Sequence, residues 1–461
     1  MKMIPVLILA VLVFLRPGPG HAAEIVPAKD RIVVLLTIDG FPAWIWREPT
    51  LPMPTLRKLA AEGAVADAMT VSNPSITWIN HTTLVTGVEP RKHGVLFNGL
   101  LIRQPPLAPV IEPWRDKAEL VRVPTVYDVA HRAGLKTAQV DWVAILNSGT
   151  IDWEFLEVPK TSGLIERELI ARGAVSANEV AGFGKGKNIA WRDMIWTRAA
   201  THIVREHKPN LLLFHLLTTD AVNHATGPGS QASYTAYAYA DRLLGEFLDE
   251  LAEAGFKEKA TILVTTDHGF KKVAKVVFPN VALRNAGLVQ IDKEKVSRCD
   301  AYAMAQGGMA FVYINDPARR ESLLPQLRDL FAGLEGVAQV IEGDAATKLG
   351  MPLPSENPGM GDLVLFAKAG YAFKGAFDGE ELVAPSSNYL GTHGYIASDP
   401  DLDGVFIATG YGIKQGARAA RIRNLDVAPT IAALLGVELP ASDGRVLSEF
   451  LSFDLPHKDK K

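Results

Sequence analysis

The chain has 461 residues, of which 48% are hydrophobic and 21% are charged, and its formal net charge is −3 at pH 7. This length allows one large domain or two to three average ones, with enough apolar surface to bury a core. The small net charge gives no general electrostatic reason to expect a nucleic-acid polymer or an anionic membrane surface as partner. The single cysteine, Cys299, excludes an intramolecular disulfide.

The N-terminus has the features of an export signal. Lys2 precedes an apolar run over residues 4–15, which is too short to span a bilayer as a helix. A Pro-Gly-Pro-Gly segment ends the run, and Ala22 and Ala23 offer small residues for cleavage. We therefore expect a signal peptide over residues 1–23 and an exported protein, periplasmic or secreted, without a stable membrane span. An uncleaved membrane anchor is the alternative.

Apolar runs alternate with helical patterns along most of the chain. The runs that indicate buried strands cover residues 32–39, 136–141, 211–220, 261–267 and 404–409. The helical patterns cover residues 54–62, 124–133, 189–206, 233–254 and 427–435. This alternation predicts an α/β fold with a mostly parallel sheet and helices on both faces.

The pattern changes between about residues 276 and 385. Two expected strands and the helix between them cover residues 308–315, 318–332 and 362–368. We interpret this stretch as a smaller inserted α+β subdomain. Residues 24–275 and 386–461 would then form the two parts of the catalytic core, the second with a C-terminal tail.

Four of the predicted strands end in aspartate, at Asp39, Asp141, Asp220 and Asp267. In open parallel sheets, ligands bind beyond the carboxyl ends of the strands. A single aspartate at such a place is most simply a helix cap. Several carboxylates that converge on one edge repel one another unless a cation joins them. The set as a whole therefore favours a metal site.

Three histidines accompany these aspartates. Asp220 and His224 are four residues apart, so a helical turn places both on one face. Asp267 and His268 are neighbours and can share a metal only where the strand has ended, a turn that the glycine after them permits. His393 lies far downstream in a segment with glycines on both sides.

Three aspartates and three histidines suit two zinc ions. Zinc accepts both ligand types and usually takes about four ligands, so a nucleophile and a phosphate oxygen would complete two such sites. Two metals about 4 Å apart are the expected device for in-line displacement at phosphorus. Other divalent metals remain open, because availability also selects the metal.

Thr77 is the candidate nucleophile. A threonine hydroxyl is a weak nucleophile at neutral pH, and metal coordination lowers its pKa. The simpler structural role is a cap on a helix over residues 80–85. Both roles can hold, because a helix N-terminus also favours an anion.

At these residues the chain resembles the nucleotide pyrophosphatase/phosphodiesterase family of the alkaline phosphatase superfamily. The resemblance covers about residues 30–440 and depends on the order of its motifs. In chain order these are Ile38-Asp39-Gly40, Thr77 with Asn80-His81, Arg91-Lys92-His93-Gly94, Asp220 with His224, Thr266-Asp267-His268-Gly269 and Thr392-His393-Gly394. The resemblance implies an alkaline-phosphatase-like fold.

The resemblance also implies roles for individual residues. The two implied ligand sets are Asp220, His224 and His393 for one zinc ion, and Asp39, Thr77, Asp267 and His268 for the other. Asn98 stands where the family has an asparagine that donates to a phosphoryl oxygen, a device that stabilises charge developing in the transition state. A turn asparagine before Gly99 is the alternative.

Two positions depart from the family pattern. Trp78-Ile79-Asn80 stands where the family usually has Phe-Pro-Asn, and Trp78 could either stack on a flat substrate group or belong to the core. Asn223 stands before His224, where the family often has glycine. Neither change removes a ligand, but both leave the substrate open.

The predicted function is hydrolysis of phosphodiester or pyrophosphate bonds in a small nucleotide-like substrate, through a phospho-threonine intermediate. Phosphomonoesterases of the superfamily commonly add Lys or Arg near the site, and residues 139–143 contain neither, which favours a diester. A phosphomonoesterase or phosphonate hydrolase is the first alternative. A non-catalytic phosphate- or metal-binding relative is the second.

Overall fold

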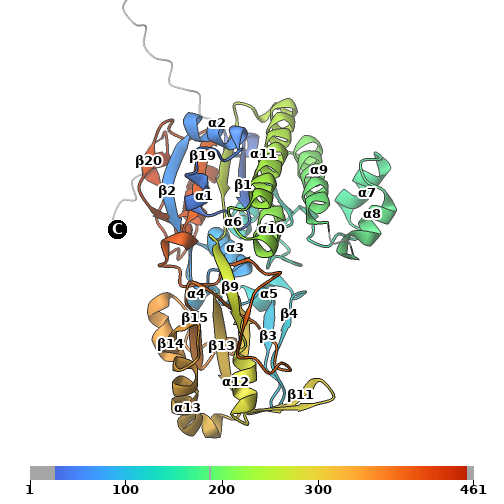
Figure 1. Cartoon of the computed structure of the whole chain (residues 1–461). Coiled ribbons are helices and arrows are strands. Elements are labelled where there is room, and N and C mark those ends of the chain that lie inside the picture. The colour runs from blue at the N-terminus through green and yellow to red at the C-terminus, as the bar shows by residue number, and fades with distance from the viewer. Residues whose placement is uncertain (1–25, 186–187, 454–461) are drawn as a thin grey trace, which may run out of the picture.

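The computed structural model describes residues 26–185 and 188–453. The predicted signal peptide therefore lies outside the described residues. Figure 1 shows two regions, one above the other: a large sheet flanked by helices in the upper region, and smaller sheets in the lower one. No helix of the described residues is long and apolar enough to cross a membrane.

The large sheet has nine strands in the order β20-β2-β19-β8-β1-β7-β5-β6, with β21 also paired to β2. Their bounds are β1 Ile32–Ile38, β2 Ala64–Thr70, β5 Thr137–Val140, β6 Trp153–Phe155, β7 Leu211–Leu216, β8 Ala260–Thr265, β19 Gly404–Gly410, β20 Arg418–Ala419 and β21 Ile422–Arg423. The central strands from β8 to β6 pair in parallel, whereas β19 is antiparallel to both of its neighbours. The sheet is therefore mostly parallel, as predicted.

Helices cover both faces of this sheet, and β1 shows why. Val34 and Leu36 pack with α2, α9 and α11, whereas Val33 and Leu35 pack in the cluster that contains α6 and α14. A central parallel strand buried on both faces reads as a continuous apolar run rather than an alternating one. The bounds of these helices are α2 Pro54–Glu62, α6 Val126–Arg132, α9 Ile189–His207, α11 Gln231–Leu251 and α14 Val427–Leu435.

The five helical patterns are confirmed, with ends that differ from the prediction by at most three residues. One strand prediction is wrong at its end. The strand expected over residues 211–220 stops at Leu216, and helix α10 (Thr218–Thr226) follows directly. Asp193 of α9 explains the early turn, because its two carboxylate oxygens accept hydrogen bonds from the backbone N–H groups of Leu217 and Thr218, each at 3.0 Å.

The lower region contains a four-stranded antiparallel sheet in the order β12-β13-β15-β14 (Figure 1). Its elements are β12 Ala301–Gln306, β13 Met309–Ile314, α13 Arg320–Ala332, β14 Val337–Glu342 and β15 Leu363–Ala367. The strands and helix expected in this stretch correspond to β13, α13 and β15. The boundaries of an inserted subdomain stay a prediction.

A second small sheet joins the two regions of the chain. β9 (Lys271–Val277) pairs with β16 (Gly370–Phe373), β17 (Val383–Pro385) and β18 (Gly391–Thr392). The remaining strands form the hairpins β3 Leu100–Ile102 with β4 Val110–Glu112, and β10 Val289–Asp292 with β11 Lys295–Cys299. Because β9 follows β8 closely, this sheet carries the segment around His393 toward the edge of the large sheet.

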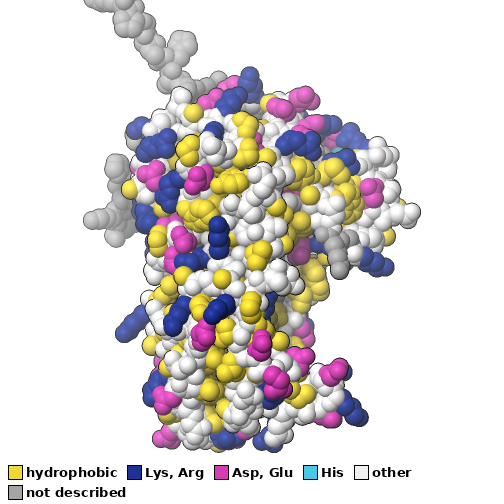
Figure 2. All heavy atoms as spheres, in the orientation of Figure 1, with side chains coloured by type: hydrophobic (Ala, Val, Ile, Leu, Met, Phe, Trp, Pro, Cys, Tyr) yellow, Lys and Arg dark blue, Asp and Glu magenta, His cyan; other side chains and the backbone are white. Residues whose placement is uncertain are grey.

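The other α-helices are short, and one of them, α3, is buried along its whole length. They are α1 Ala43–Trp46, α3 Thr77–Thr86, α4 Pro90–His93, α5 Lys117–Leu120, α7 Leu164–Ala171, α8 Ala177–Gly182 and α12 Pro279–Asn285. On the face shown in Figure 2, Lys and Arg side chains are interspersed with Asp and Glu side chains, without a large patch of either sign. This mixture agrees with the net charge of −3.

Candidate metal centre and nucleophile

The fold brings the six predicted Asp and His ligands into two triads. Asp39 follows β1, and Asp267 and His268 follow β8, so these three lie at the carboxyl edge of the large sheet. Asp220 and His224 lie one turn apart on α10, and His393 follows β18. In each triad, one possible ligand atom from each residue lies within 4.8 Å of the others; the triads are Asp39, Asp267 and His268, and Asp220, His224 and His393.

Each of the three aspartates has one oxygen without a hydrogen-bond partner. Asp267 Oδ1 accepts from the backbone N–H of Gly40 at 3.1 Å and of His268 at 3.0 Å, whereas its Oδ2 is buried and unpartnered. Asp39 Oδ1 and Asp220 Oδ1 are also buried without a partner. Buried polar atoms in proteins are almost always paired, so three orphaned carboxylate oxygens in one place fit a cation-binding site.

Each of the three histidines has an unprotonated ring nitrogen on the side of these oxygens. The Nδ1 of His224 lies 2.9 Å from the carbonyl of Gly391, that of His393 lies 2.9 Å from the carbonyl of Ser75, and that of His268 lies 3.1 Å from a neighbouring backbone carbonyl. A carbonyl only accepts, so each Nδ1 carries the proton and each Nε2 is free to bind a metal. This is the usual arrangement of metal-binding histidines.

The pKa shifts of the aspartates also favour a metal site. Burial raises the pKa of Asp39, and the neighbouring charges of Asp267 and Asp220 raise it further. Burial also raises the pKa of Asp220, with Asp267 adding to the effect. A divalent cation would favour the charged carboxylates and remove this repulsion. The residues present therefore fit metal ions.

The two triads are direct neighbours. The rings of His268 and His393, one from each triad, stack with their centroids 3.7 Å apart. His268 Nε2 lies 3.1 Å from Asp267 Oδ2, and His224 Nε2 lies 3.5 Å from Asp220 Oδ1. Tetrahedral zinc with bonds of about 2.0–2.2 Å places its ligand atoms about 3.3–3.6 Å apart, so these separations suit a shared ion.

Thr77 faces the first triad and does not cap its helix. Helix α3 begins at Thr77 itself, after Ile76, and the residue at the cap position makes no side-chain hydrogen bond to the helix. The expected helix start at residue 80 and the capping role of Thr77 are therefore wrong. The hydroxyl Oγ1 instead lies 3.4 Å from His268 Nε2. The fold thus leaves this hydroxyl available to the candidate metal centre.

Asn98 and Trp78 lie beside Thr77. The backbone N–H of Trp78 donates to Asn98 Oδ1 at 3.1 Å, which leaves the amide NH2 of Asn98 free to donate. Asn98 lines a cavity together with His224 and His393. Trp78 belongs to an apolar cluster and also lines a second cavity, so both alternatives considered for it have structural support.

Comparison with known proteins agrees with this site. The model of the type I phosphodiesterase / nucleotide pyrophosphatase family matches residues 33–396. The chain belongs to this family. It is accordingly a phosphodiesterase/pyrophosphatase hydrolase of the alkaline phosphatase superfamily.

Individual relatives extend over nearly the whole chain. Ectonucleotide pyrophosphatase/phosphodiesterase family member 7 of Homo sapiens is 23% identical over 448 residues, which are 95% of this chain and 87% of that protein. An uncharacterized pyrophosphatase/phosphodiesterase of Schizosaccharomyces pombe is 23% identical over 428 residues, 89% of this chain and 77% of that protein.

Solved structures share the fold. Murine ectonucleotide pyrophosphatase/phosphodiesterase 5 superposes with a TM-score of 0.69 at 16% identity, over 92% of this chain and 100% of that one. The human protein gives a TM-score of 0.70 at 16% identity, with the same coverage. One murine structure is of an inactive threonine-to-alanine variant in complex with AMP.

Sequence reasoning missed His215, the residue that supports Asp39 in this hydrolase. His215 lies on β7; its Nε2 is 3.0 Å from Asp39 Oδ2, and its Nδ1 is 3.1 Å from Asp141 Oδ2. Burial lowers the pKa of His215, but the charges of Asp141 and Asp39 outweigh burial and raise it well above its usual value. Asp141 is thus a partner of His215 and belongs to neither triad.

Asn223, the departure from the family pattern, has a structural role. Its Nδ2 donates to the carbonyl of Gly40 at 3.1 Å and its Oδ1 accepts from Ser233 Oγ at 2.7 Å. These bonds tie α10 to the turn after Asp39. Gly40 has φ +63°, and a Cβ there would lie 2.8 Å from the ring of Phe270, so that turn requires glycine.

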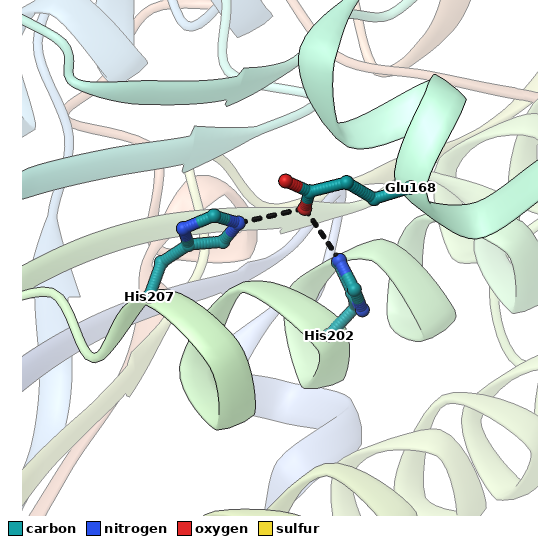
Figure 3. Close-up of side chains that lie close together, drawn as sticks. All are labelled: Glu168, His202 and His207. Carbon is teal, nitrogen blue, oxygen red and sulfur yellow. Dashed lines mark hydrogen bonds and ion pairs between the residues drawn. The ribbon is translucent and has the colours of Figure 1, made fainter. Parts of the chain in front are cut away.

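A third cluster, which consists of one glutamate and two histidines, differs from the two Asp-His triads (Figure 3). His202 Nε2 and His207 Nε2, both on α9, lie 2.7 Å from the same oxygen of Glu168 on α7. Arg172 Nη1, which can only donate, lies 3.1 Å from His202 Nδ1, so the proton of His202 is on Nε2. Both the short spacing and this tautomer indicate hydrogen bonds that clamp α7 to α9 rather than a metal site.

Proposed function

We propose that the protein is an exported two-metal hydrolase that cleaves phosphodiester or pyrophosphate bonds of nucleotide-like substrates through a phospho-threonine intermediate. The observation that carries this proposal is the convergence of three unpaired Asp oxygens and three His lone pairs beside Thr77. Zinc is the metal that this mixture of carboxylate and imidazole ligands suits best, although other divalent ions bind such ligands too.

The proposed chemistry proceeds in two displacements. Thr77 Oγ1 attacks phosphorus and forms a new O–P bond, while the bond to the leaving oxygen breaks and that oxygen is protonated. A water molecule then attacks the phospho-threonine, which frees Thr77 and releases the phosphorylated product. Divalent ions held by the two triads would lower the pKa of the hydroxyl and stabilise charge on the attacking and leaving oxygens.

Asn98 and the cavity next to Trp78 suggest how the substrate is held. The free amide NH2 of Asn98 can donate to a phosphoryl oxygen, where charge develops in the transition state. The second cavity has a volume of about 420 Å³ and is lined by Trp78, Trp114 and Trp142, by aliphatic side chains, and by the charged residues Arg115, Glu157 and Lys160. Its aromatic lining suits a flat group such as a nucleobase.

Replacement of Thr77 by alanine tests the nucleophile. We expect turnover of a bis-aryl phosphate to fall by at least about a thousandfold, while the metal content stays unchanged. Thr86→Ala is the matched control, because Thr86 is a buried threonine of the same helix whose hydroxyl donates to the carbonyl of Thr82 at 2.7 Å, away from the triads. Undiminished turnover in Thr77→Ala would rule out Thr77 as the nucleophile.

A phosphomonoesterase or phosphonate hydrolase is the competing function. It would require a positive charge against the transferred phosphoryl group, and residues 139–143 supply none. Kinetics on bis-aryl and mono-aryl phosphates separate the two functions, and we expect the diester to be preferred. A clear preference for the monoester would overturn this part of the proposal. Metal bound without turnover of either compound would instead indicate the non-catalytic relative.

Export is supported by the pattern of the first 23 residues and by no structural observation. N-terminal sequencing of the protein recovered from its natural host should find a start near Ala23 or Glu24. A start at Met1 in the mature protein would instead indicate an uncleaved anchor.

A further inference from the structure

Lys374 places a positive charge in the cavity that the second triad lines. The cavity has a volume of about 320 Å³, and its walls include Asn98, His224, His393 and Lys374. Lys374 directly follows β16, and its backbone N–H donates to the carbonyl of Val277 on β9 at 2.9 Å. The backbone of Lys374 is therefore held in place at the end of a paired strand.

No carboxylate pairs with Lys374 among residues 26–185 and 188–453. The side chain is half-buried, and this burial lowers the pKa of its ammonium group. Its close contact is the ring of Tyr389, whose centre lies 3.2 Å from Nζ. A cation that is partly removed from water without an anion is unfavourable, and a bound anion would relieve this cost.

Tyr389 connects Lys374 to the candidate metal centre. The ring of Tyr389 contacts Lys374. The same ring stacks on the ring of His224, with 5.0 Å between the centroids and 15° between the planes. The Tyr389 hydroxyl is fixed by a 2.6 Å hydrogen bond with Thr392 Oγ1. The lysine is therefore held in a defined position relative to His224 and not on a free surface loop.

The side of the site on which Lys374 lies identifies the part of the substrate that it can contact. In-line displacement places the leaving group on the side of phosphorus opposite the nucleophile. Thr77 lies against His268 of the first triad, and the cavity of Lys374 opens at His224 and His393 of the second. The cavity next to Trp78 remains for the group that stays on phosphorus.

We propose that Lys374 forms a subsite for an anionic leaving group, such as the pyrophosphate released from a nucleoside triphosphate. This inference rests on the proposed function and adds the chemical class of the leaving group. In a phosphomonoesterase, by contrast, the cation would contact the transferred phosphoryl group itself, and the choice of substrates below separates the two cases.

Two substrates that transfer the same adenylyl group test the subsite. The leaving group of adenosine triphosphate is pyrophosphate, which is anionic. The leaving group of the p-nitrophenyl ester of adenosine monophosphate is p-nitrophenol, which carries no phosphate. We expect Lys374→Met to lower kcat/KM for the triphosphate by about tenfold to a hundredfold, the effect of losing a charged hydrogen bond, and to change kcat/KM for the ester less than about threefold. Lys374→Arg should restore most of the triphosphate activity.

Lys368→Met is the matched control, because Lys368 is an exposed lysine that follows the neighbouring strand β15. It should leave both substrates unchanged. An equal loss on both substrates in Lys374→Met, or no loss on either, would overturn the subsite. A selective loss on p-nitrophenyl phosphate would also overturn it, and would favour the monoesterase.

Binding gives a result that does not depend on turnover. In a Thr77→Ala background, calorimetry should show that Lys374→Met weakens binding of adenosine triphosphate by about tenfold or more and leaves adenosine monophosphate unaffected. An unchanged ratio of the two affinities would overturn the subsite. A wild-type protein that turns over neither substrate would contradict the proposed function alone, and the calorimetric ratio would still decide on Lys374.

Discussion

At the scale of single residues, the candidate metal ligands are supported by side chains that belong to neither triad. His215 holds Asp39 Oδ2, so that Oδ1 is directed toward the first triad. Asp141 holds His215 in turn and adopts φ 56°, a left-handed conformation that aspartate tolerates better than most residues. Such support fixes the orientation of a ligand before the metal arrives.

His215→Leu should therefore weaken one metal site more than the other. The change removes the partner of Asp39 and leaves the carboxyl group of Asp141 buried without a partner. We expect the affinity of the first triad for zinc to fall by about tenfold to a hundredfold, measured by competition with a chelator. His202→Leu, a histidine of the Glu168 cluster, is the control and should leave both zinc affinities unchanged. An equal weakening of both sites by His215→Leu would contradict this positioning role.

The sequence motifs pointed to the residues of the two triads, but not to their supporting partners. Asp267 and His268 stand side by side in one motif, and Asp220 and His224 are one helical turn apart. His215 lies inside an apolar run, where nothing distinguishes it from a core residue. Lys374 was missed because the fold brings it to Asn98 and His393 from a distant segment. Local spacing predicts chemistry within a motif, whereas contacts between distant segments require the fold.

At the scale of helices and strands, the same distinction explains the error at α10. Thr218 and Thr219 are β-branched, and they extend the apolar run of β7 so that it resembles a longer strand. The chain turns instead into a helix, because Asp193 of α9 binds the first free N–H groups of α10. A cap from another helix is invisible to a local pattern. Asp220 is therefore a helix residue, yet it still joins His224 in the second triad.

The Glu168 cluster gives a prediction for the contact between α7 and α9. Burial raises the pKa of Glu168, but hydrogen bonds from His202 and His207 outweigh burial and lower it below the usual value. A carboxyl group with a lowered pKa stabilises the fold above its ordinary pKa, and the effect is lost as the pH falls through the folded-state value. Glu168→Gln should thus destabilise α7 by about 1 kcal/mol at neutral pH, and the difference should disappear on acidification.

Hydrogen exchange of the α7 amides over a range of pH measures this effect. Glu246→Gln, which removes an exposed charge that pairs with Arg242 on α11, is the control and should leave α7 unchanged. Metal content should be the same in wild type and Glu168→Gln, because we interpret the cluster as a hydrogen-bonded clamp. Loss of a bound ion on this substitution would show instead that the cluster is a third metal site.

At the scale of the whole molecule, the sequence predicted the layers of the fold but not the order of the strands. The buried run of β1 indicates a central strand, and the helical patterns indicate cover on both faces. β2 was not predicted, since its sequence, Ala-Val-Ala-Asp-Ala-Met-Thr, has few strong strand formers. It is a strand because β19 pairs with it along one edge and β20 and β21 along the other. Such pairing joins segments far apart in the chain.

Metal ions should stabilise the whole molecule, because the triads join segments from its distant parts. Asp39 and Asp267 end strands of the large sheet, whereas His393 follows the last strand of the small sheet around β9. Without ions, the raised pKa of Asp39 and Asp220 means that ionising these groups costs stability as the pH rises above the ordinary carboxyl value. With ions, the same carboxylates attract the cations and hold these segments together.

Removal of the ions with a chelator should therefore lower Tm by several degrees, and zinc should restore it. An ion present at about a hundred times its Kd contributes about 2.7 kcal/mol to the folded state, provided that the unfolded chain does not bind it. The gap in Tm between the metal-bound and metal-free protein should widen from pH 5 to pH 8, because the metal-free protein loses stability over this range. Scanning calorimetry at several pH values measures the gap. A gap that narrows with rising pH would contradict the assignment of Asp39 and Asp220 as metal ligands.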